Sequence, residues 1–356
     1  MGKFPECLLT EPKERTDVLV CFGTRPEVIK LSPVIESLAV ERVLFKTLFT
    51  GQHDELFEDV AHLLPEPHIR LDTMRKGQSP GDVMQRVMAE TGPHLQSETP
   101  RLVVIQGDTT TAAAVALTAF YQRISVGHVE AGLRTHDLNA PFPEELNRQL
   151  ISRVAQLNWA PTTTAKENLE AEGCDGTVVT GNTVVDACLK YNFLVKYGDK
   201  ILITLHRREN FGETMAEMFR QIEHLASSNS DLEFIFPMHP NPEVVKHRDL
   251  LKSVKVIEPL SYEELLRLLS EVRFVISDSG GIQEECAAFR KKVLVCRDKT
   301  ERPEGVEAGF ALTVGADIES NFSWANDSPE WNGDNPYGDG KAGERIVASI
   351  KDFLNS

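Results

Sequence analysis

The stretch DVLVCFGTRPEVIKLSP, residues 17–33, joins an apolar run to a helical pattern through a glycine and a proline. The apolar half predicts a buried strand that ends at Gly23, and Pro26 suits the first turn of a helix, which places Arg25 at the helix N-cap. Lys30 lies about one turn further along. Two cations at the N-terminal end of a helix oppose its dipole, an arrangement that makes sense when they face an anion. The alternative is that both cations are simply solvated.

The same order of elements repeats along the chain. Short apolar runs alternate with amphipathic stretches of about a dozen residues, which is typical of βαβ units and a parallel sheet. The candidate strands are residues 17–22, 43–49, 102–105, 125–129 and 156–159, followed by 200–204, 232–236, 254–257, 273–276 and 293–295. The predicted fold class is therefore α/β, with two Rossmann-like, doubly wound domains.

The domain boundaries are less strongly marked than the strands. The segment KYNFLVKYGDK follows a helical pattern and precedes a new strand, so we place the junction within it. We expect an N-terminal extension over residues 1–16, a first domain over 17–195, a second domain over 196–335 and a C-terminal helix within 336–356. With 356 residues and 41% apolar content, each domain has enough material for its own core.

Composition limits the classes of partner. Lys and Arg total 38 and Asp and Glu total 54, a formal net charge of −16, which argues against nucleic acid or an anionic membrane surface. The six cysteines contain no C-x-x-C pair and are expected to be reduced core thiols. No secretory signal or membrane-length apolar stretch is evident. These features predict a cytoplasmic enzyme with no nucleic-acid or membrane partner, in which any phosphate is bound by a local basic site.

Polar, mostly glycine-containing motifs follow the predicted strands. They are GTRPE, GQHDE, QGDTT, EAGLRT, HRREN, HPNP and SDSGG. Ligands of open α/β sheets bind outside the carboxyl ends of the strands, so these loops are expected to converge on a crevice. For two such domains, the expected active site is the interdomain cleft.

The motif ISDSGGIQEE is the clearest ligand signal among these loops. Ser279, Gly280 and Gly281 follow a strand and open a helix, where bare backbone N–H groups suit a diphosphate. Glu284 or Glu285, one turn inside the helix, could bind a pair of ribose hydroxyls. The alternative is a tight turn capped by Ser279. The motif matches neither G-x-G-x-x-G nor a Walker A loop, which argues against nicotinamide cofactors and P-loop chemistry.

Three carboxylates are candidates for acid/base chemistry. Asp108 and Glu130 each come directly after an apolar strand, a position where burial can raise a carboxyl pKa toward neutrality. Sequential strands of a parallel sheet are commonly neighbours, so both side chains could face one ligand. Glu144 follows in PFPEELNRQ. The alternatives are an N-cap role for Asp108 and an ordinary first-turn acid after Pro143 for Glu144.

Two histidines also follow apolar strands. His206 and His239 are each more often packed or capping residues than catalysts, but Arg207 and Arg208 beside His206 favour a role facing phosphate. The ten histidines show no H-x-x-x-H or H-x-H spacing near a carboxylate, which argues against a metal site. No G-x-S-x-G motif is present, which argues against acyl transfer.

Taken in order, the motifs resemble those of the non-hydrolysing UDP-N-acetylglucosamine 2-epimerases. The matching stretches are FGTRPEVIKLSPVI, GQHDEL, QGDTTT, AFYQRISVGHVEAGLRT, PEELNRQLISRVA, TGNTVVDA, HRREN, SDSGGIQEE, RDKTERPE and NPYGDGKA. The resemblance runs from about Val18 to the C-terminal helix. It implies a fold like that of the two-domain nucleotide-sugar glycosyltransferases (GT-B-like), with a second domain that binds the nucleotide, residues 336–356 returning to the first domain, and a homodimer.

The reaction that the resemblance implies interconverts UDP-GlcNAc and UDP-ManNAc without a metal or redox cofactor. A base removes the proton at sugar C2 while UDP leaves C1, and the bound 2-acetamidoglucal is reprotonated from the opposite face as UDP returns. The implied catalytic residues are Asp108, Glu130 and Glu144, assisted by His206, with no carboxylate assigned to a particular face. The implied residues for binding the UDP-sugar are Arg25, Lys30, Arg134, His239, Ser279, Gly280, Gly281, Glu285 and Arg302.

One departure concerns regulation. Bacterial members of the family bind a second, activating UDP-GlcNAc, partly through the motif after the second strand, where Arg is followed by Glu or Gln. Here that motif is Gln52-His53-Asp54-Glu55, whose acidic pair would repel a second diphosphate sugar. Activation is therefore in doubt, with Gln52, Gln149 and Arg207 as its candidates. The alternative functions are a glycosyltransferase or a non-catalytic nucleotide-sugar sensor of the same fold.

Overall fold

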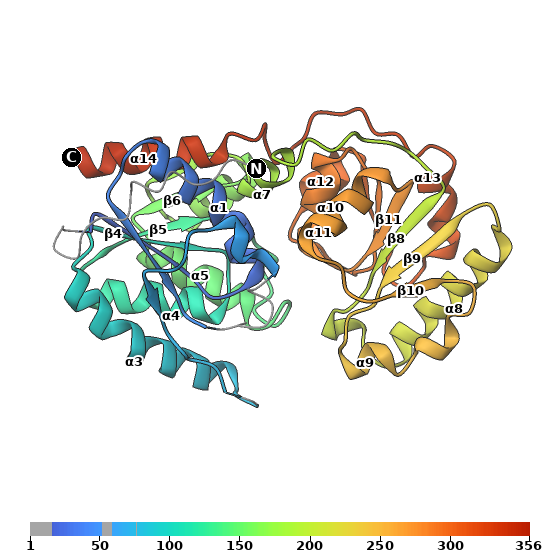
Figure 1. Cartoon of the computed structure of the whole chain (residues 1–356), viewed down its shortest axis with the longest axis horizontal. Helices are drawn as coiled ribbons and strands as arrows, with labels where there is room; N and C mark the ends of the chain where they lie inside the picture. Colours follow the sequence, from blue (N-terminus) through green and yellow to red (C-terminus); the bar gives the residue numbers. More distant parts are fainter. Residues whose placement is uncertain (1–15, 52–58, 76) are drawn as a thin grey trace. The chain divides into compact units, whose positions relative to one another are not determined.

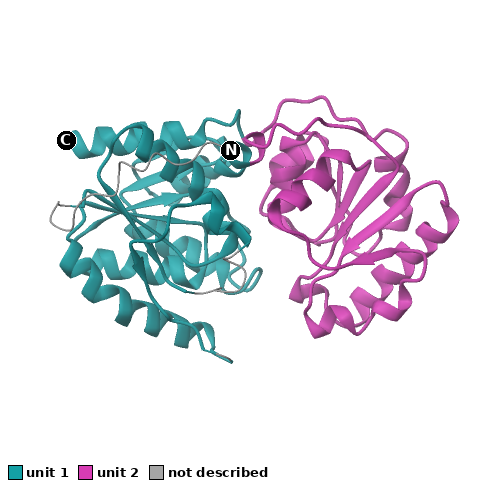
Figure 2. Ribbon diagram, viewed as in Figure 1, with its two compact units in different colours: residues 1–187, 338–356 teal, residues 188–337 magenta. Residues whose placement is uncertain are grey.

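The computed structural model describes residues 16–51, 59–75 and 77–356. The chain forms two compact units (Figure 2): unit 1 comprises the chain up to Ala187 together with Gly338–Ser356, and unit 2 comprises Cys188–Tyr337. The motif at residues 52–55, with its candidate Gln52, and nearly all of the N-terminal extension lie outside the described residues.

The chain passes from unit 1 to unit 2 earlier than the expected junction after residue 195. Residues 188–195 already contact unit 2: the rings of Tyr191 and Tyr262 have centroids 6.2 Å apart, and the Arg267 guanidinium lies 4.6 Å from the centroid of the Phe193 ring. These side-chain contacts decide the unit to which the segment belongs, whereas the sequence pattern marks only where the next strand begins. The return to unit 1 falls after Tyr337, close to the expected position.

Unit 1 is built on a parallel sheet with the strand order β3-β2-β1-β4-β5-β6-β7. Its strands are β1 (Val18–Phe22), β2 (Phe45–Phe49), β3 (Ile69–Arg70), β4 (Leu102–Gln106), β5 (Ser125–Val129), β6 (Leu157–Ala160) and β7 (Thr177–Val179). β1 pairs in parallel with β2 on one side and β4 on the other, so that Val18 lies opposite Phe45 and Leu102. The central strands are buried apolar runs, as parallel strands covered on both faces require.

Helices cover both faces of this sheet. They are α1 (Arg25–Val40), α3 (Pro80–Glu98), α4 (Thr110–Tyr121), α5 (Glu144–Val154), α6 (Thr163–Ala171), α7 (Thr183–Leu189) and α14 (Ala342–Asn355), with a 3-10 turn η2 (Ala61–Leu63). The helices α3, α4 and α5 pack side by side on one face, and α1 and α14 pack together on the other (Figure 1). The N-cap of α1 is Thr24, so Arg25 is its first helical residue and not the N-cap that the sequence predicted.

Unit 2 is built on a second parallel sheet with the order β10-β9-β8-β11-β12-β13. Its strands are β8 (Lys200–Thr204), β9 (Glu233–Pro237), β10 (Lys255–Ile257), β11 (Phe274–Ser277), β12 (Val293–Val295) and β13 (Ala311–Thr313). Its helices are α8 (Glu213–Ser228), α9 (Pro242–Val245), α10 (Tyr262–Glu271), α11 (Gly280–Ala288), α12 (Pro303–Glu307) and α13 (Phe322–Asn326). The short turns are η3 (Arg208–Asn210), η4 (Arg248–Leu250) and η5 (Glu319–Asn321).

The sequence predicted ten of these strands and missed β3, β7 and β13. Each missed strand has two or three residues and lies at the edge of its sheet. A short edge strand carries no apolar run of its own, and Val178 and Val179 of β7 are 45% and 39% exposed. No helix in the described ranges combines the length and apolar character needed to cross a membrane.

The C-terminal helix α14 packs on α1 within unit 1. Its residues Ile346, Val347 and Ile350 are buried. The carboxylate of Asp186 accepts hydrogen bonds from the N–H groups of Ala342 at 3.2 Å and Gly343 at 2.8 Å, which satisfies the first N–H groups of the helix.

Gly343 is the point of closest approach between α14 and α1. A Cβ at this position would lie 2.8 Å from the Pro33 carbonyl oxygen, whereas a Cβ at Gly81, the second residue of α3, would have no neighbour closer than 3.7 Å. We expect Gly343→Ala to lower the free energy of unfolding by about 1–3 kcal/mol through overpacking. The matched Gly81→Ala is expected to raise it by about 0.4–1 kcal/mol. Chemical denaturation of both variants measures this, and equal effects would contradict the close packing.

A second expectation concerns His128 in β5, which is fully buried. Its Nε2 lies 2.7 Å from the Gly107 carbonyl oxygen and therefore donates to it. Burial lowers the pKa of His128 to about 4, against about 6.5 in an unfolded chain. Between these values the unfolded state binds a proton that the folded state does not, so folding stability falls as the pH decreases through this window.

The variant His128→Gln retains a donor for Gly107 and has no titration. From pH 7 to pH 4, the unfolding free energy of the wild type is expected to fall by up to about 3 kcal/mol relative to that of His128→Gln. Urea denaturation of both proteins across this range measures it. Parallel pH profiles would show that the buried imidazole does not titrate in this way.

Candidate active site

The carboxyl ends of β1, β4 and β5 lie next to one another in the sheet of unit 1. The motifs GTRPE, QGDTT and EAGLRT follow these three strands and therefore lie together at the carboxyl end of the sheet. Asp108 and Glu130 follow the paired strands β4 and β5, and Glu144 opens α5.

Asp108 is held by the next helix in the chain. Its Oδ2 accepts from Nε and Nη2 of Arg148 at 2.8 Å and 2.7 Å, and its backbone carbonyl accepts from the Asn147 side chain at 2.9 Å. Arg148 is buried, and its Nη1 also donates to the fully buried Glu145 at 2.9 Å. The N-cap of α4 is Thr109, so the carboxylate of Asp108 is not used as a cap. The side chain keeps 25% of its surface exposed and can still reach a ligand.

Glu130 has the left-handed backbone conformation, with a φ of 66°, directly after β5. Its carboxylate forms an ion pair with Lys30 of α1 and accepts from the Asn182 side chain at 3.0 Å. The side chains of Lys30 and Glu130 are only 8% and 7% exposed. A non-glycine residue with positive φ costs about 1–3 kcal/mol and persists only where its surroundings hold it. The contacts to Lys30 and Asn182 supply that restraint.

Glu144 is the first residue of α5, and its environment differs from that of the other two carboxylates. Its Oε2 is buried and has no hydrogen-bond partner among the residues that the structure describes. A buried carboxylate oxygen is normally satisfied, so this atom is the one best placed to meet a donor from a substrate.

The two candidate arginines of unit 1, Arg25 and Arg134, are placed differently from each other. Arg25 is 22% exposed and forms an ion pair with Asp59 at 3.1 Å. Arg134 has a fully enclosed side chain: it donates to Glu172 twice, at 2.7 Å and 2.8 Å, to Ser152 at 2.9 Å and to the Leu133 carbonyl at 2.8 Å. These four hydrogen bonds point into the protein and favour a structural role for Arg134, whereas Arg25 presents a partly open guanidinium.

In unit 2, His239, His206 and Ser279 each lie two residues after the end of one of the neighbouring strands β9, β8 and β11. The imidazoles of His206 and His239 stack, with centroids 5.3 Å apart and an interplanar angle of 15°. Burial lowers the pKa of His206, and the nearby Asp278 only partly opposes this effect. The imidazole of His206 is therefore neutral near pH 7.

Asp278 is the residue that joins the HRREN and SDSGG loops. It is fully buried and accepts from the N–H of His206 at 3.0 Å, from the N–H of Arg207 at 2.9 Å and from the Asn210 amide at 3.0 Å. Its carboxylate also lies 3.7 Å from Nδ1 of His206. A single carboxylate thus fixes the backbone on which His206 is carried.

The glycines at the start of α11 have different surroundings. A Cβ at Gly280 would lie 2.5 Å from Nη1 of Arg302, whereas a Cβ at Gly281 would have no neighbour within 4 Å. Arg302 is buried and donates to Glu284 at 2.6 Å and to Glu301. It therefore lies behind the helix N-terminus, and Gly280 is required by the packing of the protein itself. Gly281 has open space beside it, whereas the N–H of Ser279 already donates to the Ser277 hydroxyl at 2.9 Å.

Sequence reasoning did not single out Arg148, Asn182 or Asp278. Asp278 lies inside the SDSGG motif, directly after a strand, and this position could have marked it as a candidate site residue. Arg148 and Asn182 act on carboxylates 40 and 52 residues away in the chain, a pairing that has no local signature.

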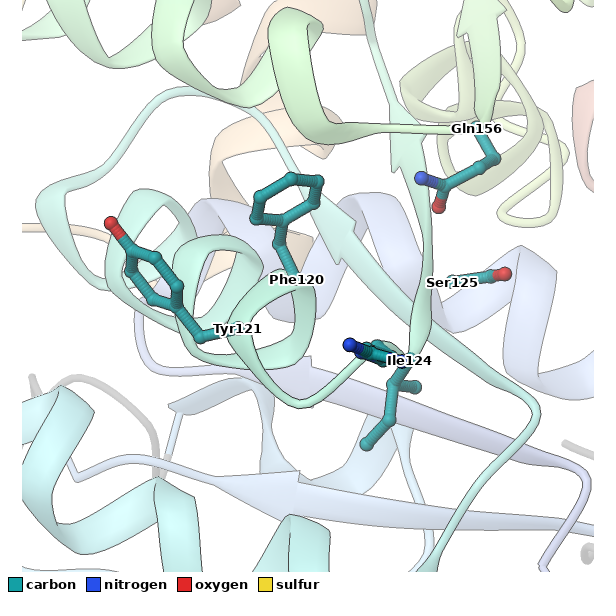
Figure 3. A pocket seen from close by; sticks show the side chains of 6 residues that line it. Phe120, Tyr121, Ile124, Ser125 and Gln156 are labelled. Carbon is teal, nitrogen blue, oxygen red and sulfur yellow. The ribbon is translucent and has the colours of Figure 1, made fainter.

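A shallow depression of about 460 Å³ lies at the amino end of β5 in unit 1 (Figure 3). Its lining residues are Phe120, Tyr121, Arg123, Ile124, Ser125 and Gln156. Ser125 is the first residue of β5 and Glu130 follows the last, so this depression is separate from the candidate site.

The comparisons with known proteins agree with one another. A family model described as UDP-N-acetylglucosamine 2-epimerase matches residues 38–351. The UDP-N-acetylglucosamine 2-epimerase of Campylobacter jejuni is 38% identical over 367 residues, covering 93% of this chain and 96% of the relative. The crystal structure of UDP-GlcNAc 2-epimerase from Neisseria meningitidis, bound to UDP-GlcNAc, has a TM-score of 0.88 at 38% identity and covers 95% of this chain and 100% of that chain.

A lipopolysaccharide outer core galactosyltransferase has a TM-score of 0.56 at 12% identity, over 95% of this chain and 98% of that chain. This is a likeness of fold alone, and it confirms the expected glycosyltransferase-like pair of Rossmann-like domains. The family match and the identity over most of the chain confirm the resemblance found in the motifs. The chain belongs to the UDP-N-acetylglucosamine 2-epimerase family, a family of isomerases.

Proposed function

We propose that this protein interconverts UDP-GlcNAc and UDP-ManNAc at sugar C2 by eliminating UDP and adding it back. The observation that carries the proposal is the set of three carboxylates that follow β4 and β5 and open α5 in unit 1. Asp108 and Glu130 are held by Arg148 and Lys30, and Glu144 has a buried oxygen without a donor among the described residues. The UDP-GlcNAc bound to the Neisseria meningitidis relative supports the choice of substrate.

The chemistry needs two acid/base groups on opposite sides of the sugar ring. A base takes the proton at C2, the C2–H electron pair forms the C1=C2 double bond, and the C1–O pair leaves with UDP. The reverse addition, with the proton delivered to the other face of C2, gives the epimer. We assign these proton transfers to Asp108, Glu130 and Glu144, because they come from three separate elements and can approach a ring from different directions.

The leaving diphosphate needs stabilisation as its charge develops. We assign this role to His206, Ser279 and the N–H groups of Gly280 and Gly281 in unit 2, together with Arg25 in unit 1. Glu285 is assigned to the ribose hydroxyls, and His239 supports the ring of His206. The enclosed cations contribute indirectly: Lys30 holds Glu130, Arg302 packs behind α11, and Arg134 fixes the loop after β5.

Incubation of the purified protein with UDP-GlcNAc in D₂O tests the proposal. Proton NMR should show loss of the C2 proton signal together with the appearance of UDP-ManNAc. Asp108→Asn should reduce turnover at least a hundredfold and change the UDP dissociation constant less than threefold, because Asp108 is not assigned to the diphosphate. The exposed Asp175→Asn is the matched control and should behave as the wild type.

The other outcomes identify the alternatives. Free ManNAc with UDP would indicate a hydrolysing enzyme, and sugar transfer only with an added acceptor would indicate a glycosyltransferase. UDP binding with an unchanged spectrum would indicate a nucleotide-sugar sensor. A collapse of UDP binding in a folded Asp108→Asn protein would contradict the assignment of roles.

A further expectation concerns proton uptake at His206. Burial lowers the pKa of this imidazole in the free protein, and a diphosphate beside it favours the protonated form. UDP binding should therefore take up protons near pH 7, and UDP affinity should rise as the pH falls from 8 to 6. Calorimetry in buffers of different ionisation enthalpy measures the uptake. Equal uptake in wild type and His206→Asn would remove His206 from the diphosphate site.

A further inference from the structure

Glu27 is a buried carboxylate that joins two loops of the candidate site. It is the third residue of α1 and is 2% exposed. Its Oε2 accepts from the N–H groups of Gly23 at 2.7 Å and Thr24 at 2.8 Å, and its Oε1 accepts from the hydroxyl of Thr109 at 2.7 Å. One side chain thus connects the loop after β1 to the loop after β4.

Thr109 links this carboxylate to Asp108, its neighbour in the chain. The hydroxyl of Thr109 donates to Glu27 and at the same time accepts from the Ala112 N–H at 3.0 Å, which caps α4. Its orientation is therefore fixed from two sides. On the other side of Asp108, the N–H of Gly107 donates to the Val129 carbonyl of β5 at 3.0 Å.

The hydrogen bonds of Glu27 come from neutral groups. In the described ranges they are donated by two backbone N–H groups and a hydroxyl, and no Lys or Arg donates to this carboxylate. Burial raises the pKa of Glu27, and hydrogen bonds from Thr109, Gly23 and Thr24 act in the opposite direction. A buried carboxylate loses its water, so these hydrogen bonds to it are strong and hold the two loops together.

We propose that Glu27 is a positioning residue for Asp108: through Thr109 it fixes the backbone from which the Asp108 carboxylate meets the substrate. The inference rests on the proposed function. It adds a residue that the acid/base assignment did not include. Arg148 and Asn147 of α5 hold the carboxylate and the carbonyl of Asp108. Glu27 of α1 adds a third support, because it holds the next residue, Thr109.

The isosteric Glu27→Gln isolates the contact to Thr109. The amide oxygen of Gln can still accept from Gly23 and Thr24, but its NH₂ group then faces Thr109, whose hydroxyl must turn round. We expect kcat to fall about 10- to 100-fold, because a displacement of about 1 Å at a reacting group has this size of effect. The KM for UDP-GlcNAc and the dissociation constant of UDP should change less than threefold.

A matched control is available in unit 2. Glu264 is also the third residue of a helix, and its Oε2 accepts from the N–H and hydroxyl of Ser261 at 2.9 Å and 2.6 Å, but it is exposed and contacts no second loop. Glu264→Gln therefore removes the same charge at the same helical position without the bridge. Its kcat should equal that of the wild type.

The second variant series acts from the other end of the contact. Thr109→Val removes the hydroxyl and should also lower kcat, whereas Thr109→Ser keeps it and should retain at least half of the wild-type kcat. Because Glu27 and Thr109 act through one bond, the double variant Glu27→Gln/Thr109→Val should be no slower than the slower single variant. Multiplying effects in the double variant would overturn the proposed coupling.

The outcomes separate the inference from the function on which it rests. A wild-type protein that does not exchange the C2 proton overturns the proposed function and this inference with it. An active wild type whose Glu27→Gln variant melts at a lower temperature but keeps its kcat per folded molecule overturns this inference alone, since Glu27 would then serve only the fold. A lowered kcat with unchanged KM, absent in Glu264→Gln, supports it.

Discussion

A charge removed from water at the end of a strand needs an opposite charge or several hydrogen-bond donors beside it, and this constraint governs the loops of both units. The loss of hydration costs several kcal/mol per ion, and only a close partner with good geometry offsets it. In unit 1 the buried cations Lys30 and Arg148 are paired with Glu130 and Asp108. In unit 2 the buried Arg302 is paired with two glutamates. The same pairs that make burial possible also hold the candidate carboxylates Asp108 and Glu130 in place without a ligand.

The same constraint separates the candidate arginines into those used by the fold and those open to a ligand. An enclosed guanidinium with four internal hydrogen bonds, as at Arg134, is already committed to the fold. A partly exposed one, as at Arg25, can still approach an anion. In unit 2 the backbone N–H groups at Gly280 and Gly281 can perform the same task, because N–H groups carry partial charge without the desolvation penalty of a full cation. An acidic protein can in this way bind a diphosphate without a large basic surface.

The sequence was sufficient to predict the elements that depend only on residues close together in the chain. Ten strands were predicted because a buried parallel strand is a continuous apolar run, and Asp108, Glu130 and His206 were selected because each directly follows such a run. What could not be predicted depends on contacts between distant residues. The pairing of Arg148 with Asp108 and of Asn182 with Glu130 is decided by which helix packs beside which strand. The boundary at Ala187 is likewise decided by the ring contacts of residues 188–195 with unit 2, which leave no mark in composition.

The three carboxylates differ in how much of their hydrogen-bonding capacity the fold already uses. Asp108 accepts from Arg148, and Glu130 accepts from Lys30 and Asn182, whereas the buried Oε2 of Glu144 accepts from no described residue. A reaction that removes a proton from one face of a carbon and returns it to the other needs groups of unequal character, since one must accept while another donates. Three identical environments would not provide that difference. The fold draws the three carboxylates from the loops after β4 and β5 and from α5 and gives each its own set of partners, which is the difference that the proposed reaction needs.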